Sequence, residues 1–257
     1  MNKPQLALIL GGITLVILLY QLPRVVVENE TLVDTGSESH SFTIPQEVRS
    51  LISDLRSKWS GEVDTEKKLN FADSLATLYL DYQEIDSALW FVDQIKLSGK
   101  EAAAWRVVDL TYEAFQRARD TEEARELGTR AAEEIRSLLT LHPDNSSLKN
   151  KLAMTLVASE NPMAGIQMLR GILEETPNDL EAIKNLGILS IQSGQFEIAE
   201  GRFMDYLSID STDQEALFYL GMCRIEMGNE KGMQIMQQLS SSDNPAIRSL
   251  AIEYLEN

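Results

Sequence analysis

An internal repeat of 34 residues in the last third of the chain constrains the fold more than any other feature. Its apolar runs have the spacing of three and four residues that is typical of helices, and none alternates with period two. A leucine and the small residue after it recur in register: Leu152-Ala153, Leu186-Gly187 and Leu220-Gly221. A unit of this length holds two helices and cannot bury its apolar face alone, so the sequence predicts a stack of helix hairpins.

Further positions keep the same register. The next small position holds Gly165 and Ala199, with Met233 as the exception, and four residues later stand Leu169 and Phe203, with Gln237 as the departure. Pro177 and Pro245 close the first and third periods, and Ser211 stands in the middle one. The central period also carries these matches: Ile183, Leu186-Gly187, Gly194, Phe196, Ala199 and Phe203. This pattern resembles the tetratricopeptide repeat, although Ser190 stands where that repeat has an aromatic residue.

The resemblance implies an all-α solenoid, a right-handed superhelix of helix hairpins, over residues 45–257. The strongest repeats are 146–179, 180–213 and 214–247, and five hairpins cover about 68–245, followed by a capping helix over 246–257. Small residues such as Gly187 and Gly221 then let the first helix of a hairpin approach the second. Another amphipathic helix is expected from Pro45 to Trp59, and the three tryptophans, Trp59, Trp90 and Trp105, are expected in the core.

The N-terminal residues 6–22 form an uncharged apolar run of 17 residues. A helix of this length spans roughly 26 Å, within the lower range for crossing a membrane. We expect residues 1–24 to be an uncleaved transmembrane signal anchor that contacts the lipid bilayer, and residues 25–44 to be a flexible acidic linker. A cleaved signal peptide and a buried soluble helix are the alternatives.

The charges that flank this run indicate its orientation. Lys3 and the α-amine precede it, whereas Arg24 is followed by the acids Glu28 and Glu30. This distribution favours an N-terminus in the cytoplasm and repeats outside it, which makes the protein a single-pass protein of the inner (cytoplasmic) membrane.

The composition argues against several classes of function. A formal net charge of −17 disfavours nucleic acid, whose binding depends on Lys and Arg at the phosphates. The single cysteine, Cys223, cannot form an intramolecular disulfide and is expected to be an inert buried thiol, and the two histidines are far apart. Because we find no catalytic triad, no phosphate-binding loop and no metal-ligand spacing, we expect neither an enzyme nor a cofactor.

The resemblance also indicates where a partner protein would bind. The ligand groove of tetratricopeptide repeats is lined by set positions of each first helix, here including Ser147, Glu181 and Glu215 at the outer end. The candidate protein-binding residues are Asn150, Met154, Val157, Lys184, Ile188, Ile191, Phe218, Met222 and Ile225. The inner part of this set is apolar, which favours an apolar helix or extended segment as ligand. In the alternative, these residues pack against neighbouring helices or the capping helix.

Two functions are consistent with these features. The first is a membrane-anchored adaptor or scaffold for protein–protein interaction, used in the assembly or maintenance of an envelope complex. The second is a subunit of a dedicated envelope machine, such as that of cytochrome c maturation, which presents an apolar groove to substrate proteins. A third function, an enzyme accessory or lytic factor, is disfavoured because the repeats cover nearly the whole soluble part of the chain.

Overall fold

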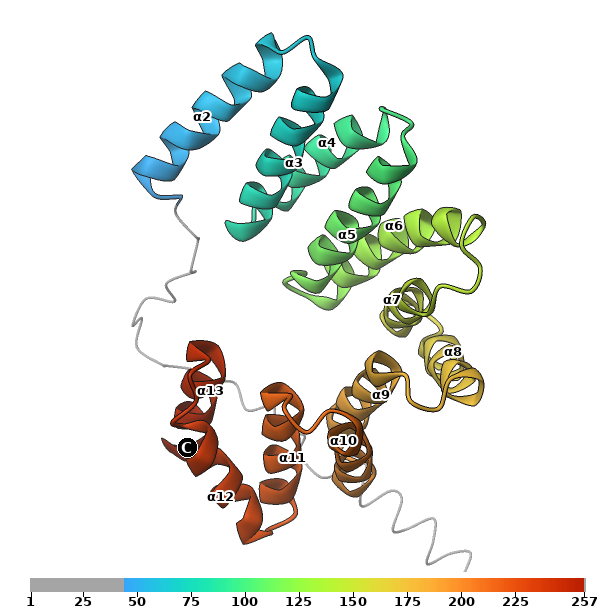
Figure 1. Ribbon diagram of the computed structural model, residues 1–257, viewed down its shortest axis with the longest axis vertical. Coiled ribbons are helices and arrows are strands. Elements are labelled where there is room, and N and C mark those ends of the chain that lie inside the picture. The colour runs from blue at the N-terminus through green and yellow to red at the C-terminus, as the bar shows by residue number, and fades with distance from the viewer. Residues whose placement is uncertain (1–43, 257) are drawn as a thin grey trace, which may run out of the picture. The chain divides into compact units, whose positions relative to one another are not determined.

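A computed structural model describes residues 44–256 of the chain (Figure 1). This part contains helices and no strand, which confirms the all-α prediction. The helices are α2 (Gln46–Gly61), α3 (Thr65–Asp81), α4 (Ile85–Lys96), α5 (Glu101–Gln116), α6 (Thr121–Leu139), α7 (Ser146–Val157), α8 (Pro162–Glu175), α9 (Leu180–Gln192), α10 (Phe196–Ile209), α11 (Gln214–Glu226), α12 (Glu230–Leu239) and α13 (Pro245–Glu256).

Successive helices pair into five hairpins, α3–α4, α5–α6, α7–α8, α9–α10 and α11–α12, and each hairpin packs on the next. We call the first helix of each hairpin the A helix and the second the B helix. At the two ends, α2 packs on α3, and α13 packs on α11 and α12. The buried side chains form several clusters that follow one another along the stack. Such a core is expected when each repeat contacts only its neighbours.

The 34-residue period reappears in the residues that begin and end the A helices. Asn145, Asp179 and Asp213 are the N-caps of α7, α9 and α11, and each side chain accepts a hydrogen bond from the N–H three residues on, at 2.8, 2.8 and 3.0 Å. Gly194 and Gly228 follow α9 and α11, both with a φ of +71°. A side chain is strained in that conformation, so glycine suits both turns.

The small residues of the repeat lie where A and B helices meet. A Cβ atom at Gly187 would lie 2.7 Å from Cζ of Phe203 on α10, and one at Gly221 would lie 2.8 Å from Cγ2 of Ile235 on α12. Both distances are shorter than a van der Waals contact. The prediction that the B helix packs directly against these glycines is therefore confirmed.

At Ser190, where the repeat pattern has an aromatic residue, the side chain of Arg202 takes the place of the missing ring. Ser190 is buried, and Arg202 of α10 occupies the neighbouring space. The Nη1 atom of Arg202 donates to the carbonyl oxygen of Leu186 at 2.6 Å and also to Oγ of Ser190. A guanidinium group thus replaces the aromatic ring that the repeat pattern has at this position, and its burial lowers the pKa of Arg202.

The expectation that all three tryptophans are core residues is wrong for Trp90, which is 46% exposed. Trp59 and Trp105 are half-buried. The cause is the way α2 closes the stack: α2 packs mainly on α3 and reaches α4 at its end, where the ring of Trp59 meets that of Trp90. The outer face of α4 therefore stays open to solvent.

Among residues 44–256, no helix is both long and apolar enough to span a membrane. The predicted anchor, residues 1–24, lies outside the described residues, and so does the predicted linker, 25–44, except for Ile44.

Candidate protein-binding site

The A helices follow one another along one side of the stack and the B helices along the other (Figure 1). Helix α9 contacts both α7 and α11 directly, in addition to its own B helix. Side chains on the open side of these three A helices can therefore form one surface that crosses the repeats. The nine candidate residues lie on them, three on each helix.

Six of the nine are apolar side chains that are half-buried: Met154, Val157, Ile188, Ile191, Met222 and Ile225. We call these six the A-helix face. The four on α9 and α11 pack from outside against one buried cluster, which also contains Phe203. The structure thus brings most of the predicted apolar residues together on neighbouring helices and leaves each partly open to solvent.

The two members on α7 line a pocket of about 570 Å³ between α5, the start of α6, α7 and α9, and Arg119 and Asp120 also contribute to its lining. Phe115 forms part of its wall from α5, and Leu189 and Gln192 form part from α9. These three residues were not predicted from the sequence. Gln192 could have been predicted from the sequence, because it lies four residues after Ile188 and therefore one turn further along the same helix face.

Asn150 is a correction to the predicted groove, because its side chain is fully buried. Its Nδ2 atom donates to the carbonyl oxygen of Ser146 at 3.2 Å and to Oδ1 of Asp179 at 3.1 Å. Its Oδ1 atom accepts from Nδ2 of Asn185 at 3.4 Å. The amide thus ties α7 to α9, with both of its donors engaged, and its burial keeps it out of reach of a ligand.

Phe218 is the second correction, since only 8% of it is exposed. Its ring meets that of Tyr254 on α13 edge to face, with 6.0 Å between centroids. The hydroxyl of Tyr254 donates to Oε1 of Glu226 at 2.8 Å and holds the ring in place. Phe218 therefore belongs to the contact with the last helix, as the alternative from the sequence allowed.

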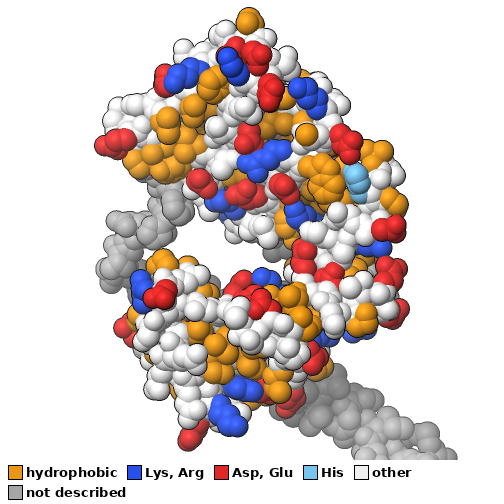
Figure 2. Space-filling view, in the orientation of Figure 1, with side chains coloured by type: hydrophobic (Ala, Val, Ile, Leu, Met, Phe, Trp, Pro, Cys, Tyr) orange, Lys and Arg blue, Asp and Glu red, His pale blue; other side chains and the backbone are white. Residues whose placement is uncertain are grey.

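Lys184 is partly exposed, but it already has a partner, because its Nζ atom lies 2.9 Å from Oε2 of Glu215. Similar ion pairs join other neighbouring A helices, and Figure 2 shows acidic and basic side chains interleaved along the stack. The pairs are Asp73–Arg106, Asp109–Lys151 and Lys184–Glu215. A ligand that used Lys184 would first have to displace Glu215.

The carboxylate of Glu181, at the start of α9, is partly buried, which disfavours its ionised form. Burial raises the pKa of Glu181, and a hydrogen bond from Ser147 opposes that rise. Burial also raises the pKa of Tyr112 to about 12, with a smaller contribution from the charge of Glu181. Lys151 and Lys184 lie near enough to favour the ionised form of Glu181. The polar end of the A helices is thus a compact network of charges that already compensate one another.

Within the described part of the chain, no group of three or more His, Cys, Asp or Glu side chains is placed to hold a metal ion. Cys223 is buried in α11, as expected, and burial raises the pKa of its thiol to about 11. The thiol therefore stays protonated at neutral pH and is a poor nucleophile.

Comparison of the sequence with protein-family models and with curated proteins finds no match. Solved structures do share the fold. A tetratricopeptide repeat protein from Parabacteroides merdae matches with a TM-score of 0.53 and 15% identity, over 81% of this chain and 81% of that one. PilW, a widely conserved type IV pilus biogenesis factor, matches with a TM-score of 0.52 and 15% identity, over 80% of this chain and 91% of its own. The described residues therefore have the fold of tetratricopeptide-repeat proteins.

Proposed function

We propose that this protein is a scaffold for protein–protein interaction that binds an apolar segment of a partner on the A-helix face and catalyses no reaction. The observation that carries the proposal is the row of six half-buried apolar side chains on α7, α9 and α11. Five of the six already pack on a buried cluster from one side, and Val157 lies beside Gly165 where α7 meets α8, so a partner would remove the remaining apolar area from water without reordering the helices.

The chemistry of the face favours an apolar ligand. Its charged neighbours are paired with one another, as Lys184 is with Glu215, so they offer little to a charged chain terminus. The pocket beside Met154 and Val157, about 570 Å³ in volume, is large enough for a bulky apolar side chain. A partner helix or extended segment with two or three apolar anchors fits this arrangement.

The test uses two aspartate substitutions on the face and one control. Ile188→Asp and Met222→Asp in the full chain should abolish capture of the partner from membranes while leaving the helical circular dichroism unchanged. The control is Ile198→Asp on α10, a B-helix position that is 49% exposed, and it should retain capture. Loss of capture in all three variants, or retention in all three, would contradict this assignment of the face.

The second part of the proposal places the scaffold at a membrane, where it would hold components of an envelope complex together. Residues 6–22 supply the support, because they are an uncharged run of spanning length. We propose a single-pass anchor in the inner (cytoplasmic) membrane, with the repeats on the outer side.

This placement has its own test. The full chain should remain in the membrane pellet after a carbonate wash, and protease added to spheroplasts should digest the repeats. A soluble mature form starting near Val25 would identify residues 1–24 as a cleaved signal peptide instead. Repeats protected from the protease would reverse the orientation.

A further inference from the structure

Four apolar side chains gather at the N-terminal end of the repeats, far from the A-helix face in sequence. We call Trp59, Val63, Trp90 and Leu97 the N-terminal patch. Val63 is 95% exposed and Leu97 79% exposed, the two highest values among the exposed large apolar side chains of the described residues. The rings of Trp59 and Trp90 meet edge to face with 5.3 Å between their centroids.

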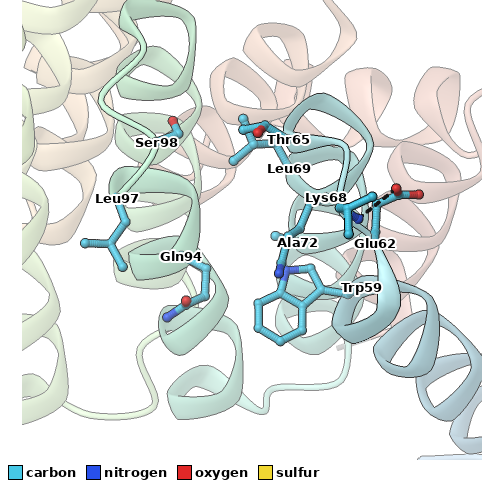
Figure 3. A pocket seen from close by; sticks show the side chains of 10 residues that line it. Trp59, Glu62, Thr65, Lys68, Leu69, Ala72, Gln94, Leu97 and Ser98 are labelled. Atoms are coloured by element: carbon cyan, nitrogen blue, oxygen red, sulfur yellow. Dashed lines mark hydrogen bonds between the residues drawn. The ribbon is translucent and has the colours of Figure 1, made fainter.

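A pocket of about 470 Å³ joins three of the four patch residues. Figure 3 shows Trp59 on one side of this pocket, with Gln94 and Leu97 of the α4 region on the other. Trp90, Gln94 and Leu97 are spaced by four and three residues and so share one face of the helix. The patch is therefore continuous from the end of α2 to the end of α4.

The charge around the patch differs from that of the rest of the chain. Residues 44–100, which contain the whole patch, hold seven basic and ten acidic side chains, a net charge of −3, whereas residues 101–257 hold 14 and 26, a net charge of −12. At the patch, Nζ of Lys68 lies 5.0 Å from the ring centroid of Trp59, and Lys67 next to it is exposed. The N-terminal end thus carries a small share of the negative charge of the domain, and anionic lipid headgroups repel it less than they repel the later repeats.

The patch also lies close along the chain to the predicted anchor. The apolar run ends at residue 22 and α2 begins at Gln46, so 23 residues separate the two. Fully extended, these 23 residues span at most about 80 Å. The start of the repeats therefore stays within about 80 Å of the membrane surface, and a compact linker would allow it to touch the bilayer.

We propose that the N-terminal patch rests in the headgroup region of the same bilayer that residues 6–22 cross, a proposal that depends on the anchoring proposed above. Trp and Lys side chains are favoured at this depth, because an apolar body enters the acyl boundary while a polar group stays hydrated. Val63 and Leu97 supply the apolar area that water now contacts. Docking would fix the orientation of the repeats and leave the A-helix face free for its partner.

The test places a nitroxide label on the full chain reconstituted in vesicles of phosphatidylethanolamine and phosphatidylglycerol. Leu97→Cys carries the label in the patch, and Leu141→Cys, 64% exposed after α6, is the matched control. The native Cys223 is buried and should not react. The label at position 97 should collide more with dissolved oxygen and less with an aqueous nickel chelate than the label at 141. Adding Trp90→Asp to the Leu97→Cys chain should remove this difference.

The other outcomes separate the two proposals. Chains that fail to float with the vesicles refute the anchoring. Chains that float but show a water-exposed label at position 97 refute the docking alone. Spin–spin broadening between labels at position 97, lost when the chain is diluted with unlabelled chain, would assign the patch to a second copy of the protein and overturn the lipid contact.

Discussion

Replacement of Gly165 by alanine tests the contact between α7 and α8 most directly. A Cβ atom at this position would lie 2.3 Å from the carbonyl oxygen of Ala153, 2.7 Å from Cγ2 of Val157 and 2.8 Å from its backbone nitrogen. Favourable contacts between such atoms begin near about 3.5 Å, so the two helices would have to separate by roughly 1 Å. Backbone atoms cannot rotate away as a flexible side chain can, and the strain must therefore spread through the hairpin.

The change in the free energy of unfolding that Gly165→Ala causes is the sum of two opposing effects. Overpacking costs ~1–3 kcal/mol, and the better helix propensity of alanine returns up to ~1 kcal/mol. Gly171 on the same helix is the matched control, because nothing lies within 4 Å of its added Cβ and only the propensity gain applies. The two variants should therefore differ by roughly 1–3 kcal/mol in the free energy of unfolding, since both receive the propensity gain.

Thermal unfolding of the full chain in detergent, followed by circular dichroism, measures the difference. In a domain of this size 1 kcal/mol shifts Tm by roughly 2–4 °C, so Gly165→Ala should melt below Gly171→Ala by several degrees. Equal melting temperatures for Gly165→Ala and Gly171→Ala would show that α7 and α8 do not approach this closely, and the assigned packing of the repeat would be refuted.

Three further predictions follow from the same contacts. Gly187→Leu should lower Tm, because the added side chain meets the ring of Phe203, and an unchanged melting curve would argue against the repeat register. Deleting residues 246–257 should lower Tm and cause self-association, seen by light scattering, because it removes the helix that covers the apolar edge of the last hairpin. Burial raises the pKa of Glu181 in the folded state, so its ionised form opposes folding at neutral pH. Glu181→Gln should therefore stabilise the protein at pH 7 in denaturant unfolding, with the gain disappearing as pH falls through the ordinary carboxyl range, and a gain that does not change with pH would refute this account.

The sequence alone determined the repeat and its hairpins. A small residue at the crossing of two helices and an Asx residue before α7, α9 and α11 act locally, so they recur with the period and can be recognised without coordinates. Gly187 and Asp179 illustrate the two cases, the first facing Phe203 and the second capping α9. The helical spacing of the apolar residues and the 34-residue repeat indicate the same helices along the chain. The number of hairpins could therefore be predicted from the sequence.

For the candidate site, the same register predicted which side of α7, α9 and α11 a residue occupies. Met154, Ile188 and Met222 lie 34 residues apart and are half-buried on neighbouring helices. Helical periodicity fixes a direction around the helix axis and no more. It could not indicate the pocket wall that Phe115 contributes from an earlier repeat, because that contact depends on how far successive hairpins rotate.

Only the tertiary structure decided which of these positions are open to a partner. Asn150 is closed by Asp179 and Asn185, and Phe218 is closed by Tyr254 of the last helix. Trp90 has the reverse outcome and is exposed, because α2 packs on α3 and leaves the outer side of α4 uncovered. In each case the neighbour that decides whether the side chain is buried lies far away in the sequence. Burial depends on which side chains the next helix places against a helix face. The periodicity of that face carries no information about them.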